Sequence, residues 1–176
     1  MTDTELKDQI FDMYFVDCEL AEYVCQEIKI DRSMLTKFSS QIDEERKDEV
    51  QEMRRIRQLY NNKKGDDFEF TSFSSFYKWY VGQHRKQSGC CYYCKTSEKV
   101  ISELFVKKFL LNKRPNRGMH LEVERRDSKS NKYNEDNCVL ACYFCNNDKS
   151  SIFSEGEYFE YLKDRKSFFE KQLDSK

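Results

Sequence analysis

Two closely spaced cysteine pairs, at residues 91–94 and 142–145, constrain this chain more than any other feature. Each C-x2-C pair can hold a metal ion from a tight turn, and two pairs supply the four thiolates that a tetrahedral zinc ion takes. A four-cysteine site has no open position for a substrate, so we expect the zinc to be structural. Cys90 and Cys138 are spare thiols that could substitute as ligands, but the regular pairs are the better match.

The chain around the second pair reads as a strand, a polar loop, a second strand and a helix. In HLEVE (residues 120–124), period-two alternation places the histidine and both glutamates on one face and the two aliphatic residues on the other. Residues 138–141 form a short apolar run that should pair antiparallel with the first strand. A helix is then expected to start at residues 146–149.

This order of elements and motifs resembles the HNH (ββα-metal) endonuclease superfamily. Within it, the chain is most similar to the PacI-like zinc-bound restriction endonucleases, on three features. They are RGxH before the first strand, an acid-Arg pair followed by Asp-Ser, and LACxxCNxxKSxIFS after the loop. The similarity spans roughly residues 70–158. It implies an α+β fold, a mainly helical chain around a zinc-stabilised ββα-metal (HNH-like) nuclease core.

The resemblance also implies roles for single residues. Glu124 and Asn146 would hold a divalent cation, Mg²⁺ or Mn²⁺, and Asn137 matches the residue that braces the loop of the motif. Glu124 stands where the family usually has aspartate. The glutamate side chain is one methylene longer, and this extra length shifts the ion or changes its coordination. The implied zinc ligands are the four cysteines of the two pairs: Cys91, Cys94, Cys142 and Cys145.

The general base is the main departure from the family pattern, because Arg125 occupies the position that usually carries a histidine. Arginine stays protonated and cannot accept a proton, but it can bind the scissile phosphate and stabilise the charge that develops there. Another residue must then orient or deprotonate the water. PacI-like enzymes implicate a tyrosine of the first cysteine turn, which matches Tyr93, and His120 is the other local candidate.

The charge distribution favours a nucleic-acid partner for one part of the chain. The whole chain has a net charge of only −1, but residues 1–60 carry net −6, residues 61–120 net +7 and residues 121–176 net −2. A local basic segment can follow a phosphate backbone and makes binding salt-dependent. We expect double-stranded DNA as the partner, contacted by Lys113, Arg114, Arg117 and Lys149.

Helical periodicity dominates the rest of the chain. It predicts helices over residues 6–29, 31–60, 71–87, 100–111 and 155–173, with a linker at 61–67. The domains expected are an N-terminal helical region, 1–64, and a zinc-bound nuclease domain, 65–176. The second helix could pack on the first within the chain, or on a second copy to form a homodimer that cuts both strands of a palindromic site.

No targeting or membrane segment is evident. The start of the chain, MTDTELKDQ, is acidic and polar, and no apolar run approaches the roughly 20 residues that a membrane span needs. We therefore expect a cytoplasmic protein with no membrane partner, whose cysteines are reduced metal ligands.

These expectations converge on a metal-dependent endonuclease that hydrolyses phosphodiester bonds of double-stranded DNA, sequence-specifically as in type II restriction. Two alternatives stay open. One is a noncatalytic, zinc-stabilised DNA-binding module that lost its base. The other is a phage-type nicking or structure-specific nuclease.

Overall fold

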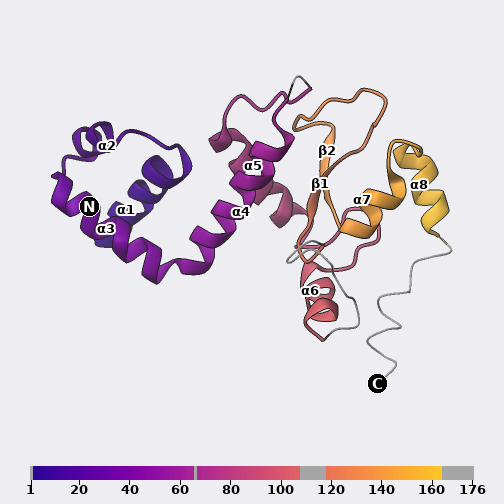
Figure 1. The fold of residues 1–176 in the computed structure, drawn as a ribbon, viewed down its shortest axis with the longest axis horizontal. Coiled ribbons are helices and arrows are strands. Elements are labelled where there is room, and N and C mark those ends of the chain that lie inside the picture. Colours follow the sequence, from indigo (N-terminus) through magenta and orange to yellow (C-terminus); the bar gives the residue numbers. More distant parts are fainter. Residues whose placement is uncertain (1, 66, 108–117, 164–176) are drawn as a thin grey trace. The chain divides into compact units, whose positions relative to one another are not determined.

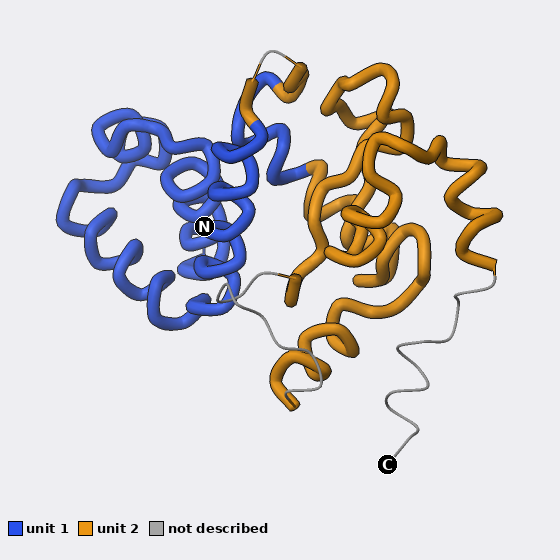
Figure 2. Tube along the Cα trace, turned by 45° about the vertical axis from the view of Figure 1, so that its right-hand side comes forward, with its two compact units in different colours: residues 1–63, 71–78 blue, residues 64–70, 79–176 orange. Residues whose placement is uncertain are grey.

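The computed structural model describes residues 2–65, 67–107 and 118–163 (Figure 1). This part of the chain is mainly helical and contains a two-stranded antiparallel sheet. It divides into two compact units, Met1–Lys63 with Thr71–Lys78, and Lys64–Phe70 with Trp79–Lys176 (Figure 2). No helix among the described residues is long and apolar enough to cross a membrane.

The first unit is helical throughout and has its own hydrophobic core. Its elements are α1 (Asp3–Ile10), the π-helical turn η1 (Phe11–Val16), α2 (Ala21–Ile28), α3 (Arg32–Glu45) and α4 (Lys47–Lys63). Thr2 caps α1 through a capping box with Glu5, and the Asp31 carboxylate caps α3 by accepting from the Met34 amide. Apolar residues from all five elements form the core: Leu6, Ile10, Phe11, Val16, Ala21, Val24, Leu35, Phe38, Ile42, Val50 and Met53.

The single helix predicted over residues 6–29 is wrong, because the chain breaks after η1 and turns at Cys18, which has a φ of 59°. The break lets the apolar residues on both sides of it, such as Ile10 and Val24, bury against α3 in one core. Residues 17–20 contain neither glycine nor proline, so the sequence has none of the usual signals for a turn at this point.

The helix predicted over residues 31–60 is also two helices, separated at Arg46 (φ −112°, ψ 32°). The Arg46 guanidinium lies 4.3 Å from the ring centre of Phe11 and donates to Asp8 (2.9 Å) and Glu49 (2.7 Å). These contacts hold the corner. The apolar stripe of α3 and α4 is buried in the same chain, which is the intrachain alternative of the two packings considered; a homodimer stays a prediction.

The second unit contains the sheet. Its elements are the later turns of α5 (Phe73–Lys86), then α6 (Glu98–Val106), β1 (Glu122–Arg125), β2 (Cys138–Ala141), α7 (Tyr143–Lys149) and α8 (Glu155–Leu162). The strands pair antiparallel as predicted, with Glu122 opposite Ala141 and Arg125 opposite Cys138. Helix α7 follows β2 directly and packs on β1 (Figure 1). The predicted ends of the helices at 100–111 and 155–173 lie outside the described residues.

Helix α5 is joined to the hairpin by side chains. The amide of Gln87, just beyond the helix, donates to the carbonyl of Leu140 (2.7 Å) and accepts from its N–H (3.0 Å). The Tyr80 hydroxyl donates to the carbonyl of Leu121 (3.1 Å). The hairpin is therefore held from α5 by groups outside the sheet.

The end of the predicted linker belongs to the second unit. Residues 67–69 run beside the loop between β1 and β2, where Phe68 forms a parallel bridge with Tyr133. The Tyr133 N–H donates to the carbonyl of Asp67 (2.8 Å), and the Glu69 N–H donates to the carbonyl of Tyr133 (2.9 Å). Because α4 continues to Lys63, the connection between the units is shorter than predicted.

Candidate metal centre and active site

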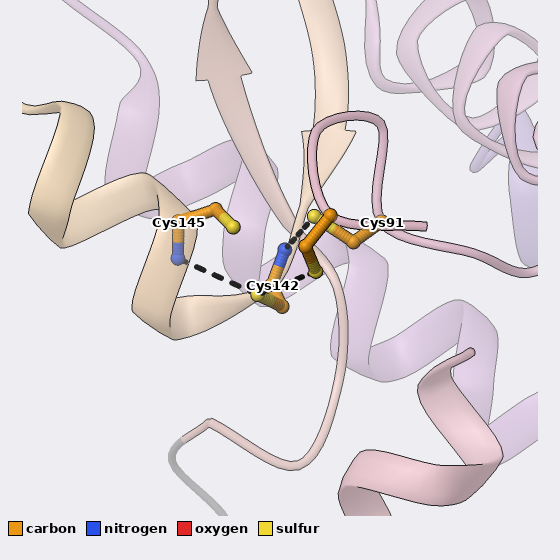
Figure 3. Close-up of side chains that lie close together, drawn as sticks. Cys91, Cys142 and Cys145 are labelled. Atoms are coloured by element: carbon orange, nitrogen blue, oxygen red, sulfur yellow. Dashed lines mark hydrogen bonds between the residues drawn. The ribbon is translucent and has the colours of Figure 1, made fainter. Parts of the chain in front are cut away.

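Four cysteine sulfurs converge where the hairpin meets α7. Figure 3 shows three of these residues, Cys91, Cys142 and Cys145. The ligand atoms of Cys91, Cys94, Cys142 and Cys145 all lie within 4.8 Å of one another, and the Sγ atoms of Cys94 and Cys142 are 3.9 Å apart. With Zn–S bonds of about 2.3 Å, sulfurs of a tetrahedral site lie roughly 3.8 Å apart. The donor set and its spacing therefore fit a structural zinc, as predicted.

Cys142 also starts α7. It is the N-cap of the helix, and its sulfur accepts from the N–H of Cys145 (3.4 Å), while its own N–H donates to the sulfur of Cys91 (3.2 Å). The predicted helix start at residue 146 is wrong by one turn, because a cysteine sulfur here takes the capping role that Ser, Thr, Asp or Asn usually has. Asn146 consequently lies inside the helix.

Helix α7 brings Lys149 against the end of β1. Lys149 is fully buried, and its ammonium donates to the Glu124 carboxylate (3.3 Å), the Arg125 carbonyl (3.0 Å) and the Ser128 hydroxyl (2.9 Å). Glu124 is 8% exposed. The sequence placed Lys149 among the DNA contacts; because its three donors all have partners within the chain, we now propose that it positions Glu124 and the start of the loop.

One turn earlier on α7, Asn146 faces the other carboxylate of β1. Its Nδ2 donates to Oε2 of Glu122 at 2.6 Å. This contact orients the amide and leaves the carbonyl oxygen of Asn146 as the atom that can bind a cation. Sequence reasoning placed Glu122 on the polar face of the strand but gave it no role, since its partner is 24 residues away.

Two buried polar atoms of the second unit have no hydrogen-bond partner among the described residues, the Tyr93 hydroxyl and Nε of Arg125, the residue that follows Glu124. Tyr93 is 3% exposed. Burial first, and then the negative charge of Glu124, raises its pKa, so its hydroxyl stays protonated and can donate. Buried polar atoms usually have partners, and exceptions are common where a water or a ligand binds.

Asn137 holds the loop that follows β1. Its side chain accepts from the N–H of Asp127 (2.8 Å) and donates to the carbonyls of Asp127 (3.0 Å) and Lys132 (2.9 Å) and to the Ser130 hydroxyl (3.0 Å). These bonds close the loop that follows Arg125.

The two histidines of the chain meet on one carboxylate. His120 Nδ1 lies 2.7 Å from Oε1 of Glu98, and His84 Nε2 lies 3.1 Å from its Oε2. Glu98 is the first residue of α6, so this contact joins three segments that are distant in sequence. The predicted DNA contacts Lys113, Arg114 and Arg117 lie outside the described residues.

The hairpin, the helix packed on it and the four-cysteine cluster together match the ββα core of HNH proteins. The chain is similar to a solved structure of that class, the rare-cutting HNH restriction endonuclease PacI, an enzyme with an extraordinary mechanism of DNA perturbation. The identity is 28% over 68% of this chain and 78% of PacI, with a TM-score of 0.51. Comparisons with models of protein families and with curated proteins found no match. The resemblance and the fold class inferred from the sequence are thus confirmed.

Proposed function

We propose that this chain is a metal-dependent endonuclease that hydrolyses phosphodiester bonds of double-stranded DNA at a specific sequence, as type II restriction enzymes do. The observation that carries the proposal is the packing of α7 on β1, which sets Asn146 against Glu122 and Lys149 against Glu124. The similarity to PacI supplies the class of reaction.

The oxygens of Glu124 and Asn146 suit Mg²⁺ or Mn²⁺, which are hard cations that prefer oxygen ligands. When bound, such an ion stabilises the charge that develops on the phosphate and on the leaving oxygen. Lys149 pairs with the Glu124 carboxylate and holds it in place, and Glu122 orients the Asn146 amide. A zinc ion held by the four cysteines would fix the first cysteine turn against the start of α7.

Arg125 and Tyr93 act on the phosphate in this proposal. The guanidinium of Arg125 binds its oxygens, and the Tyr93 hydroxyl donates a hydrogen bond to the phosphate or to the attacking water. The raised pKa of Tyr93 argues against its taking a proton. Of the two candidates, His120 has the imidazole, a ring whose unprotonated nitrogen can accept a proton, and Glu98 contacts its Nδ1, which leaves Nε2 for that step.

The test is cleavage of a long, sequence-diverse DNA in Mg²⁺ or Mn²⁺ by the full chain. Asn146→Ala and EDTA should abolish cleavage, and His120→Gln should slow it by about 100-fold. Asn147→Ala is the matched control, because Asn147 is the exposed neighbour on the same helix and its amide donates to the carbonyl of Tyr143 in that helix.

Each outcome separates the alternatives. Discrete double-strand fragments from the wild type support restriction-like cleavage, and light scattering then shows whether the homodimer that both cuts would use exists. Nicked circles alone from a supercoiled plasmid indicate a nicking enzyme. Intact DNA with every metal, together with salt-sensitive binding, refutes the nuclease and favours the DNA-binding module.

A further inference from the structure

The side chain of Arg125, the last residue of β1, packs against an aromatic ring. Its guanidinium carbon lies 4.8 Å from the ring centre of Tyr133, which is in the loop between the strands. Its Nε is buried and has no hydrogen-bond partner among the described residues. The cation is thus placed by contact with an aromatic face, which uses none of the N–H donors on its edge.

The position of Tyr133 is set by a segment far away in the sequence. Both backbone hydrogen-bonding groups of Tyr133 are paired with residues 67–69, through the Asp67 carbonyl and the Glu69 N–H. The ring of Phe68 packs at 6.2 Å from the ring of Tyr133, centre to centre. The position of the Tyr133 ring therefore depends on residues 67–69, which precede α5 in the sequence.

Side chains on either side of Tyr133 tie the same two segments together. Asn131 donates to the Asp67 carboxylate, Asn134 donates to that of Glu69 (2.7 Å), and Lys132 forms an ion pair with Glu69 (2.7 Å). Each of these contacts is partly exposed and individually weak. Together with the backbone bonds they fix the loop over four consecutive residues, 131–134.

We propose that Tyr133 is a positioning residue for Arg125, and that residues 67–69 set where its ring stands. A guanidinium binds phosphate through N–H groups on its edge and stacks on aromatic rings through its face. The ring of Tyr133 can therefore hold Arg125 without competing for the donors that phosphate needs. The inference rests on the proposed function, in which Arg125 binds the scissile phosphate.

The test is a double-mutant cycle on the cleavage rate of the full chain acting on DNA in Mg²⁺ or Mn²⁺. Tyr133→Leu, which removes the ring, should slow cleavage by about 10- to 100-fold, as misplacement of a catalytic group by about 1 Å can. Tyr133→Phe keeps the ring and should stay within about threefold of the wild type. In an Arg125→Ala background, Tyr133→Leu should cause no further loss, because the two residues act as one unit.

If the fold-reductions in cleavage rate of the two single variants multiply in the double variant, the proposal is wrong. It is also wrong if Tyr133→Phe cuts as slowly as Tyr133→Leu. Tyr14→Leu, which removes a partly exposed tyrosine of the first unit, is the control for loss of a tyrosine in general. Its rate should match that of the wild type.

A second measurement tests whether Tyr133 stacks on Arg125, and it does not depend on DNA cleavage. If the wild type cuts no DNA, the proposed function fails but the stacking can still be tested. The Nε–H resonance of Arg125, assigned with Arg125→Lys, should carry a ring-current shift in the wild type and in Tyr133→Phe. That shift should be lost in Tyr133→Leu. A resonance that is the same in all three proteins would refute the stacking and the inference with it.

Discussion

Lys149 is a fully buried ammonium group, which is stable only because each of its three donors has an acceptor. Lys149→Met keeps most of the side-chain volume but leaves the Glu124 carboxylate buried without its cation. We expect it to lower the free energy of unfolding by about 3 kcal/mol, the cost of breaking a buried ion pair from one side. Denaturant unfolding of the zinc-loaded protein measures this change.

The matched control is Lys163→Met, since Lys163 pairs with Glu160 and both side chains are mostly exposed (67% and 70%). This exposed pair should contribute less than about 0.5 kcal/mol. Equal effects of the two substitutions would show that Lys149 is not the brace that its burial indicates.

At Tyr93, the contribution of the ring to packing can be separated from the contribution of the hydroxyl to catalysis by removing the hydroxyl alone. Its ring packs edge-on against Tyr158 and also contacts Phe159, whereas its hydroxyl is buried without a partner among the described residues. Tyr93→Phe should therefore change the free energy of unfolding by less than about 1 kcal/mol but slow DNA cleavage by about 10- to 100-fold. Unfolding and single-turnover cleavage are measured on the same preparation; unchanged cleavage would remove Tyr93 from the site.

At the scale of elements, α8 is joined to the end of β1 by one ion pair. Arg126 donates twice to Glu155, in the first turn of the helix, at 2.7 and 2.9 Å. The pairing lowers the pKa of Glu155. Because the folded pKa is the lower one, the stabilisation is complete above the ordinary pKa of a glutamate and is lost as the pH falls through the lowered value.

Glu155→Gln should then lower the free energy of unfolding by about 1 kcal/mol at neutral pH, a modest value because Arg126 is partly exposed. The difference from the wild type should shrink as the pH is lowered into the acid range. Urea unfolding at a series of pH values checks this, with Glu160→Gln on the exposed side of α8 as the control. A difference that does not depend on pH would contradict the ion-pair account.

At the scale of the molecule, the metal should matter to one unit only. All four cluster cysteines belong to the second unit, while the first has a core of its own. Chelating the zinc should therefore unfold the second unit, since metal binding is coupled to folding, and leave the helices of the first unit folded. Circular dichroism with limited proteolysis distinguishes this from loss of the whole fold.

Two cysteine variants sharpen that test. Cys145→Ser should lose the zinc, whereas Cys90→Ser, next to the ligand Cys91 but outside the cluster, should keep one zinc per chain. Zinc content measured on purified protein decides between them. A loss of zinc in Cys90→Ser would mean that the spare thiol is a ligand.

What the sequence determined by itself is the hairpin, the metal cluster and the class of protein. These features depend on local patterns, because alternation along HLEVE and the spacing within each C-x2-C pair follow from the geometry of strands and turns. Helix existence was predictable for the same reason, but the breaks at Cys18 and Arg46 were not. A periodic apolar pattern continues through a break between two helices when the break is stabilised by residues distant in the sequence, so the pattern does not reveal it.

Only the tertiary structure decided which partner each polar side chain of the site has. Lys149 reaches Glu124, Asn146 faces Glu122, and the Tyr133 ring holds Arg125 from a loop tied to residues 67–69. The first two pairs join residues about 25 positions apart, and the last contact depends on a segment from before α5. Burial and hydrogen bonding select such pairs only after the chain has folded, since the pairing energy depends on exclusion of water from the contact.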